Sequence, residues 1–130
     1  MQQITIIFDH NIPAEQCFIF HHVTALWGES ILIMEREGRA FCRIYWYNDD
    51  STTVCLDWLS VDAEVRKQGI GTRLQEIREE IGKNRGATFS CLQVEKNSWM
   101  HAWYKRRGYA DWVDNESEEN TIWMKKSLIS

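Results

Sequence analysis

The chain has 130 residues, of which 44% are hydrophobic and 26% charged, with seven tryptophans and a formal net charge of −4. A composition this apolar excludes a disordered chain, and the length predicts a single domain, residues 1–130. The negative charge argues against a nucleic-acid-binding protein, because neutralising a phosphate backbone requires a basic surface.

The four cysteines carry no pattern of a metal site or of a disulfide scaffold. Cys17, Cys42, Cys55 and Cys91 form no CxxC pair and no Cys/His cluster at zinc spacing. We therefore expect reduced thiols packed as small hydrophobic residues, and no metal. The N-terminal residues lack the basic leader of a signal peptide, and no window is long and apolar enough to cross a bilayer. These features predict a cytoplasmic protein that does not act at a membrane.

The first half of the chain predicts strands interrupted by one helix. A helix is expected from Pro13 to Trp27, because proline is tolerated in a first helical turn and Gly28 follows as a stop. Alternating and β-branched residues predict the strands of this half, at residues 2–8, 30–36, 39–47 and 52–61.

The second half opens with a change of periodicity. Ile70, Leu74, Ile77 and Ile81 recur at spacings of four, three and four, which is the apolar face of a helix, and Gly86 follows as its end. The remaining predicted elements are a strand at 88–94, a helix at 98–107 and a closing hairpin of 109–113 with 121–126. The order β-α-β-β-β-α-β-α-β-β predicts an α/β (α+β) fold with a mixed, mainly antiparallel sheet flanked by helices.

The stretch VRKQGIGTRL, Val65 to Leu74, lies between a predicted strand and a predicted helix. The start of a helix has unpaired N–H groups and a partial positive charge, and glycines allow a phosphate to approach them. The chain has no GxxxxGK[ST], which excludes a Walker A loop. Leu74 stands where a dinucleotide fingerprint needs its third glycine. An anion site at a helix start and a merely flexible loop remain as alternatives.

Two motifs resemble those of the GNAT superfamily of N-acetyltransferases. LSVDAEVRKQGIGTRL contains the acyl-CoA-binding core [RQ]-x-x-G-x-[GA] as residues 66–71. Downstream, Asn97, Tyr104 and Gly108 fit the family pattern N-x-x-A-x-x-x-Y-x-x-x-G-[FY], although Met100 stands where a small residue is usual. Two motifs in the right order and spacing are more specific than either alone.

The resemblance implies a splayed sheet and an enzyme that moves an acetyl group from acetyl-CoA directly to a primary amine of a small molecule, protein or peptide. The alternative is a domain of the same fold that binds acyl-CoA without turnover, as a sensor or interaction module.

The resemblance also implies the co-substrate site. The pyrophosphate of CoA would lie on the amides of residues 66–71, and the pantetheine arm along the end of strand 52–61. Asn97 is either a cofactor-side residue or the N-cap of the helix after it. The full implied set is Leu59, Ser60, Val61, Arg66, Lys67, Gln68, Gly69, Ile70, Gly71, Thr72, Asn97 and Tyr104.

Catalysis requires an acid for the leaving thiolate and a base for the amine. Tyr104 is the expected general acid; otherwise it is a helix residue that packs on the sheet. Asp57 matches an acidic position of the family in strand 52–61 and is the expected base, unless it is only an outward-facing strand residue. Glu95 and an ordered water are the alternatives.

The acceptor is less constrained. The acidic turn with Asp114, Glu116, Glu118 and Glu119 would favour a cationic amine, or is simply a solvated loop. A lone histidine such as His101 is more often a surface or packing residue than a catalytic one. The last strands of the family often mediate homodimers, so a homodimer is a further expectation.

Overall fold

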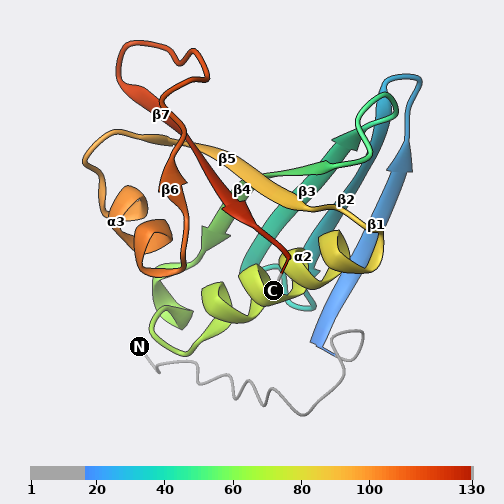
Figure 1. Ribbon diagram of the computed structural model, residues 1–130. Helices are drawn as coiled ribbons and strands as arrows, with labels where there is room; N and C mark the ends of the chain where they lie inside the picture. Colours follow the sequence, from blue (N-terminus) through green and yellow to red (C-terminus); the bar gives the residue numbers. More distant parts are fainter. Residues whose placement is uncertain (1–16, 130) are drawn as a thin grey trace.

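The computed structural model describes residues 17–129 (Figure 1). In chain order its elements are β1 (Phe18–Thr24), β2 (Gly28–Glu35), β3 (Ala40–Tyr47), β4 (Thr53–Val61), the 3-10 turn η1 (Ala63–Val65), α2 (Ile70–Asn84), β5 (Phe89–Glu95), α3 (Trp99–Arg106), β6 (Ala110–Asp111) and β7 (Thr121–Ser127).

The strands form one sheet in the order β1-β2-β3-β4-β5-β7-β6. Neighbouring strands are antiparallel except β4 and β5, which are parallel and are joined by α2 as a crossover. In Figure 1, α2 crosses one face of the sheet, with α3, β6 and β7 toward one end and β1 to β3 toward the other. The predicted mixed, mainly antiparallel sheet with flanking helices is confirmed.

The predicted helix from Pro13 to Trp27 is wrong from Phe18 onward, whereas Cys17 is helical. Residues 18–24 form β1 instead, paired with β2 from Phe18 opposite Glu35 to Thr24 opposite Glu29. Their sequence, FIFHHVT, is rich in aromatic and β-branched residues, which fit a pleated surface. Hydrogen bonding to β2 therefore decides the conformation of residues 18–24. The predicted strand 2–8 lies outside the described residues.

The core lies between the sheet and α2. Ala40, Cys42, Ile44 and Trp46 alternate along β3 and are all buried. The apolar stripe of α2 packs onto this face, and it contributes the buried side chains of Ile70, Leu74 and Ile77. Burial of these side chains supplies the main stabilisation of the fold.

The opposite face holds a pair of thiols. Cys55 of β4 lies opposite Cys91 of β5, their Sγ atoms are 3.5 Å apart, and both side chains are buried. This pair is one rung before the last one between the two strands, which joins Leu56 to Leu92.

Beyond that rung β4 and β5 diverge. The rest of β4 continues beside β3, and the rest of β5 pairs with β7. The register between β3 and β4 shifts here, and Trp58 has a φ of 58°, in the left-handed region. Such a bulge bends the strand and re-aims its side chains. The splayed sheet is thus present, and it opens an apolar gap beside the start of α2.

Candidate active site

The loop before α2 has the backbone geometry of an anion site. Lys67 and Gly69 have φ values of 66° and 83°, so the chain turns through left-handed conformations directly before the helix. The first helical hydrogen bond runs from the Arg73 N–H to the Gly69 carbonyl, at 2.9 Å. The amides that precede it in α2, those of Ile70, Gly71 and Thr72, have no intrahelical acceptor. Together with the helix dipole they favour a phosphate.

Two arginines fix this loop on either side. Arg66 donates from Nε to the Val61 carbonyl at 2.9 Å, which ties the loop to the end of β4. Arg107 donates from Nη2 to Thr72 Oγ1 at 3.0 Å, and its guanidinium lies 3.4 Å from the centroid of the Trp103 ring. Burial lowers the pKa of Arg107, and the neighbouring Arg106 adds to that effect. The anion loop is therefore held by β4 and by α3.

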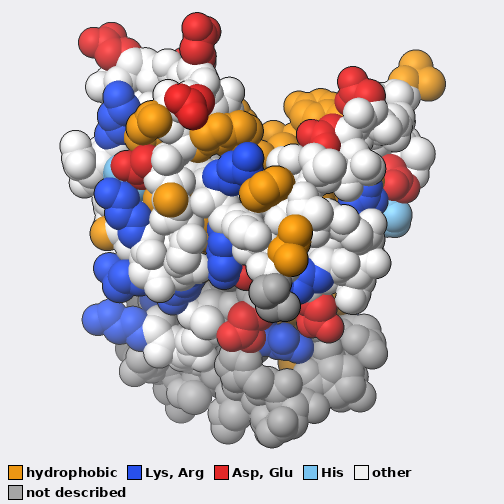
Figure 2. All heavy atoms as spheres, in the orientation of Figure 1, with side chains coloured by type: hydrophobic (Ala, Val, Ile, Leu, Met, Phe, Trp, Pro, Cys, Tyr) orange, Lys and Arg blue, Asp and Glu red, His pale blue; other side chains and the backbone are white. Residues whose placement is uncertain are grey.

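A cavity of about 550 Å³ opens between this loop and α3. Of the residues that the resemblance assigns to the co-substrate, all line it except Gln68, Asn97 and Tyr104. Trp99, Met100 and Trp103 of α3 form the opposite wall. In Figure 2, Lys and Arg side chains gather on the flank formed by α3 and the segment before α2. The cavity thus combines an apolar interior with a basic rim.

A second cavity, of about 360 Å³, brings together the three predicted acid and base residues. Asp57, Glu95 and Tyr104 all line it, although they come from β4, β5 and α3. The two cavities share Leu59, Trp99 and Met100 in their linings, so they adjoin. Met100, the residue that departs from the family motif, therefore lies where the two cavities meet.

Tyr104 is 3% exposed, and its hydroxyl oxygen accepts a hydrogen bond from Arg78 Nη2 at 3.0 Å. Its ring packs edge-on against the rings of Trp103 and Tyr109. The side chain therefore does pack as a core residue, while it also contributes to the lining of the second cavity.

The two candidate bases differ in their surroundings. Asp57 accepts hydrogen bonds from Arg43 on both oxygens, with Nε to Oδ1 at 2.8 Å. The Arg43 guanidinium also lies 3.8 Å from the Trp58 ring centroid. Glu95 is exposed, and no residue within 17–129 pairs with its carboxylate. Asp57 is thus engaged in a charged cluster, whereas Glu95 is open to the cavity.

Asn97 lines neither cavity, and it is not the N-cap of α3. Ser98 is the cap, because its Oγ accepts from the His101 N–H at 3.2 Å. Asn97, with a φ of 61°, donates its backbone N–H to His101 Nδ1 at 3.0 Å. Since Nδ1 accepts, His101 Nε2 carries the proton and donates to Asp111 Oδ1 at 2.7 Å. His101 is buried and is a packing residue, one of the two ordinary readings for a lone histidine.

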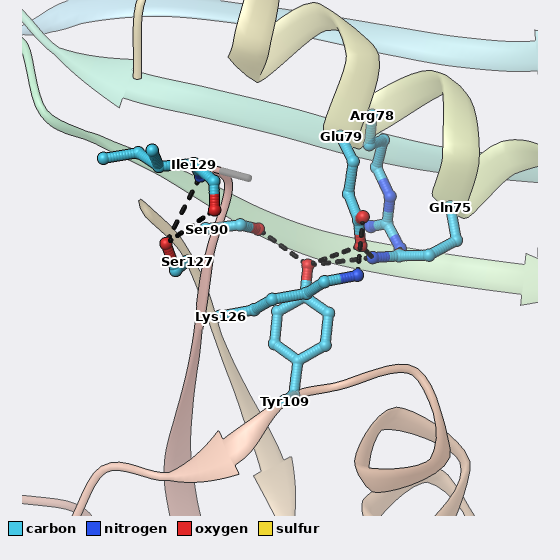
Figure 3. A network of polar contacts seen from close by, with 8 residues as sticks. All are labelled: Gln75, Arg78, Glu79, Ser90, Tyr109, Lys126, Ser127 and Ile129. Carbon is cyan, nitrogen blue, oxygen red and sulfur yellow. Dashed lines mark hydrogen bonds and ion pairs between the residues drawn. The ribbon is translucent and has the colours of Figure 1, made fainter. Parts of the chain in front are cut away.

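The polar residues of α2 are the part of the site that sequence reasoning missed. Arg78 is 0% exposed, and its Nη2 donates a hydrogen bond to the hydroxyl oxygen of Tyr104. Beside it, Gln75 and Glu79 join Tyr109 and Lys126 in a network that ties α2 to the last strands (Figure 3). One indication was present in the sequence: position 78 follows Leu74 by four residues and so belongs to the apolar stripe.

Other predicted features lie away from the cavities. Asp114, Glu116, Glu118 and Glu119 are exposed on the loop between β6 and β7, where Figure 2 shows carboxylates at the tip. Within residues 17–129, no group of His, Cys, Asp and Glu side chains is arranged to hold a metal ion. In the same range, no helix has the length and apolarity to cross a membrane.

Comparison with known proteins agrees with this geometry. A family model described as an acetyltransferase (GNAT) domain matches residues 27–111. A Klebsiella pneumoniae protein classed as an acyl-CoA N-acyltransferase superposes with a TM-score of 0.65 at 13% identity, covering 86% of this chain and 98% of that one.

Two similar structures contain a ligand. A GNAT family acetyltransferase from Elizabethkingia anophelis with acetyl-CoA bound has a TM-score of 0.61 at 18% identity, covering 85% of this chain and 98% of that one. The PaiA N-acetyltransferase from Thermoplasma acidophilum in complex with coenzyme A has a TM-score of 0.60 at 19% identity, covering 75% and 59%. A search of curated protein sequences gives no match. These identities establish likeness of fold alone, but the family model covers more than half of the chain, and this protein therefore belongs to the GNAT family of acetyltransferases.

Proposed function

We propose that this protein transfers an acetyl group from acetyl-CoA directly to a primary amine. The observation that carries the proposal is the position of the anion loop at the mouth of the gap between β4 and β5. A phosphate-bearing ligand anchored on the loop would extend an apolar arm into that gap. Acetyl-CoA has this shape, and two structures of the same fold contain acetyl-CoA or CoA.

The donor would be held mainly by backbone groups. The amides at the start of α2 would take the pyrophosphate, with Thr72 close by and the side chains of Arg66 and Lys67 at the rim. The edge of β4 at Leu59 to Val61 that faces the gap would pair with the amide groups of the pantetheine arm, beside the Val61 carbonyl that already accepts from Arg66. The thioester would then lie where the two cavities adjoin.

The second cavity would admit the amine. Its nitrogen attacks the thioester carbonyl, a C–N bond forms, and the C–S bond breaks as the tetrahedral intermediate collapses. The amine proton passes to a base, and the departing thiolate takes a proton from Tyr104. We infer that Glu95 is better placed than Asp57 as the base, since both oxygens of Asp57 already accept from Arg43. We also propose a cationic amine as acceptor, which the carboxylates of the exposed loop would attract at long range although they do not line the cavity.

The rival function is acyl-CoA binding without turnover. An acceptor cavity filled by aromatic side chains would favour it. The open second cavity of about 360 Å³, with a phenol and two carboxylates in its lining, favours the enzyme.

The test combines binding with turnover. We expect acetyl-CoA and CoA to raise the melting temperature of the protein, and we expect acetylated product, detected by mass spectrometry, from at least one member of a panel of polyamines, small primary amines and lysine-containing peptides. Direct product detection avoids the background that the four cysteines give with thiol-reactive dyes.

The outcomes separate the two functions. Stabilisation by acetyl-CoA together with product supports the enzyme. Stabilisation with no product from any amine supports the binding module and contradicts the enzyme. No stabilisation by any acyl-CoA contradicts both.

A further inference from the structure

Arg78 of α2 is a charged side chain in the centre of the molecule. It is 0% exposed, and it lies on the helix face that packs against the sheet. Arginine remains protonated in proteins, so the core contains a permanent positive charge. Burying an ion costs several kcal/mol unless its surroundings compensate for the lost water.

The compensation at Arg78 is incomplete. Within residues 17–129 no carboxylate pairs with it directly, and its Nε has no hydrogen-bond partner. Nη2 donates to Gln75 Oε1 at 2.6 Å, and the Gln75 amide donates in turn to Glu79 at 2.8 Å (Figure 3). The nearest counter-charge on this path is therefore one amide away. An apolar side chain of similar volume would suit a purely structural role better.

What Arg78 contacts is the candidate acid. Its second Nη2 contact is the hydroxyl oxygen of Tyr104, at 3.0 Å. A guanidinium can only donate, so the Tyr104 oxygen must accept, and its own proton remains for another acceptor. The part of the chain that the structure describes offers none, and Tyr104 lines the second cavity.

Arg78 also reaches the strand at the edge of the gap. Nη1 lies 3.4 Å from the Arg43 carbonyl and 3.3 Å from the Asp57 carbonyl, next to the bulge at Trp58. The same guanidinium therefore connects the bulged strand with the phenol on α3.

We propose that Arg78 is a positioning residue for proton delivery, which holds the Tyr104 oxygen as an acceptor so that the phenol donates its proton to the thiolate released where the second cavity adjoins the first. The proposal rests on the proposed acetyl transfer. When the O–H bond of Tyr104 breaks and a proton passes to sulfur, the phenol becomes a phenolate with negative charge on oxygen. The Arg78 cation at 3.0 Å stabilises that charge in a water-poor site. The free-energy cost of burying the Arg78 charge is present with or without substrate, and the charge then stabilises the phenolate during the reaction.

A double-mutant cycle tests this role. Arg78→Met, Tyr104→Phe and the double variant are compared with the unmodified protein for kcat, for KM of acetyl-CoA and for melting temperature. We expect Tyr104→Phe to lower kcat about 100-fold, the lower range for loss of a general acid, and Arg78→Met to lower it about 10- to 100-fold. KM for acetyl-CoA should change little, because Arg78 does not line the larger cavity.

The interaction between the two changes decides the matter. In the Tyr104→Phe background, Arg78→Met should reduce kcat less than about threefold, because the group on which Arg78 acts is already gone. Equal losses in both backgrounds would overturn the proposal, since displacement of β4 would act whether or not the hydroxyl is present. Arg85→Met is the matched control: Arg85 follows the same helix and stacks on Trp46, and kcat should be unchanged.

Folding is monitored by circular dichroism. If Arg78→Met does not fold, the cycle is run with Arg78→Lys, which retains the charge on a single donating nitrogen. A smaller loss of kcat that again disappears in the Tyr104→Phe background supports the proposal. A loss that persists there overturns it. Absence of product from the unmodified protein with every amine overturns the acetyl-transfer function as well.

Discussion

The two carboxylates that line the second cavity differ in whether another side chain already pairs with them. Asp57 is tied to Arg43, which in turn stacks on the Trp58 ring, so its first effect is to hold the bulged part of β4. Glu95 extends from the end of β5 without such a partner in residues 17–129. A base must have a free lone pair directed at the proton that it removes. The surroundings therefore favour Glu95.

We expect Glu95→Gln to lower kcat about 100-fold near neutral pH, as removal of a general base typically does, and Asp57→Asn to lower it less than about tenfold. Initial rates at saturating acetyl-CoA over a range of pH measure both. Glu80→Gln, on the exposed side of α2, is the control and should leave kcat unchanged. A larger loss for Asp57→Asn than for Glu95→Gln would reverse the assignment.

The sequence predicted the residues that line the two cavities better than it predicted the buried residues that hold them in position. The motif at residues 66–71 marks the anion loop because its glycines meet a backbone requirement that can be read locally. The helical pattern places Arg78 on the apolar stripe, but it does not show which groups the guanidinium contacts there. Its partners on β3, β4 and α3 come from distant parts of the chain.

Among the helices and strands, α2 shows how one element serves both binding and packing. Gly71 is at its start, where an added Cβ would lie 3.8 Å from Val61 and from Trp103, both of which line the larger cavity. Gly82 is near its end, where a Cβ would lie 2.9 Å from a Val54 methyl and 3.0 Å from Leu128 Cδ1. The first glycine leaves room for a ligand and the second leaves room for the core.

Alanine at the two positions should therefore have opposite effects. Gly71→Ala should raise the free energy of unfolding by up to about 1 kcal/mol through helix propensity, while it reduces the stabilisation that CoA gives. Gly82→Ala should lower that free energy, because overpacking of about 1–3 kcal/mol exceeds the propensity gain. Urea unfolding and CoA-dependent melting curves measure both quantities. Equal CoA stabilisation in Gly71→Ala and the unmodified protein would show that the Cβ does not disturb the ligand.

β1 shows why one element was predicted wrongly. The helix expected from Pro13 rested on local capping and proline rules, and those rules do not contain the partner strand. Pairing of residues 18–24 with β2 supplies hydrogen bonds that only the assembled sheet can provide. The later strands were predicted correctly because their alternating and β-branched residues are a local signal.

For the molecule as a whole, carboxylates in hydrogen-bonded settings set the response to acid. The hydrogen bond from His101, assisted by Lys105, holds the pKa of Asp111 below its usual value of 3.8. Burial alone would raise the pKa of Glu35, but the hydrogen bond from Arg39 and two backbone N–H groups lower it below 4.5. Both groups bind protons more readily in the unfolded chain than in the folded one.

Stability should therefore be fully present above these usual pKa values and be lost as pH falls through the lower values of the folded state. We expect the urea midpoint to be nearly constant from neutral pH down to about pH 5 and to fall steadily below it. In Asp111→Asn the acid fall should be shallower, whereas Asp114→Asn, in the exposed loop, should behave like the unmodified protein. Tryptophan fluorescence follows the unfolding, and a midpoint that rises on acidification would contradict the assignment.

The Cys55–Cys91 pair allows the opening of the sheet between β4 and β5 to be measured chemically. The hydrogen bond between the two thiols lowers the pKa of Cys55 and raises that of Cys91, while burial raises the pKa of Cys42 to about 11. Because both thiols are buried, an alkylating reagent reaches them mainly when β4 and β5 separate transiently. The labelling rate of Cys55 therefore reports the frequency of local opening between these two strands. A ligand bound between the two strands would lower the alkylation rate of Cys55, so that ligand binding could be measured without any enzymatic reaction.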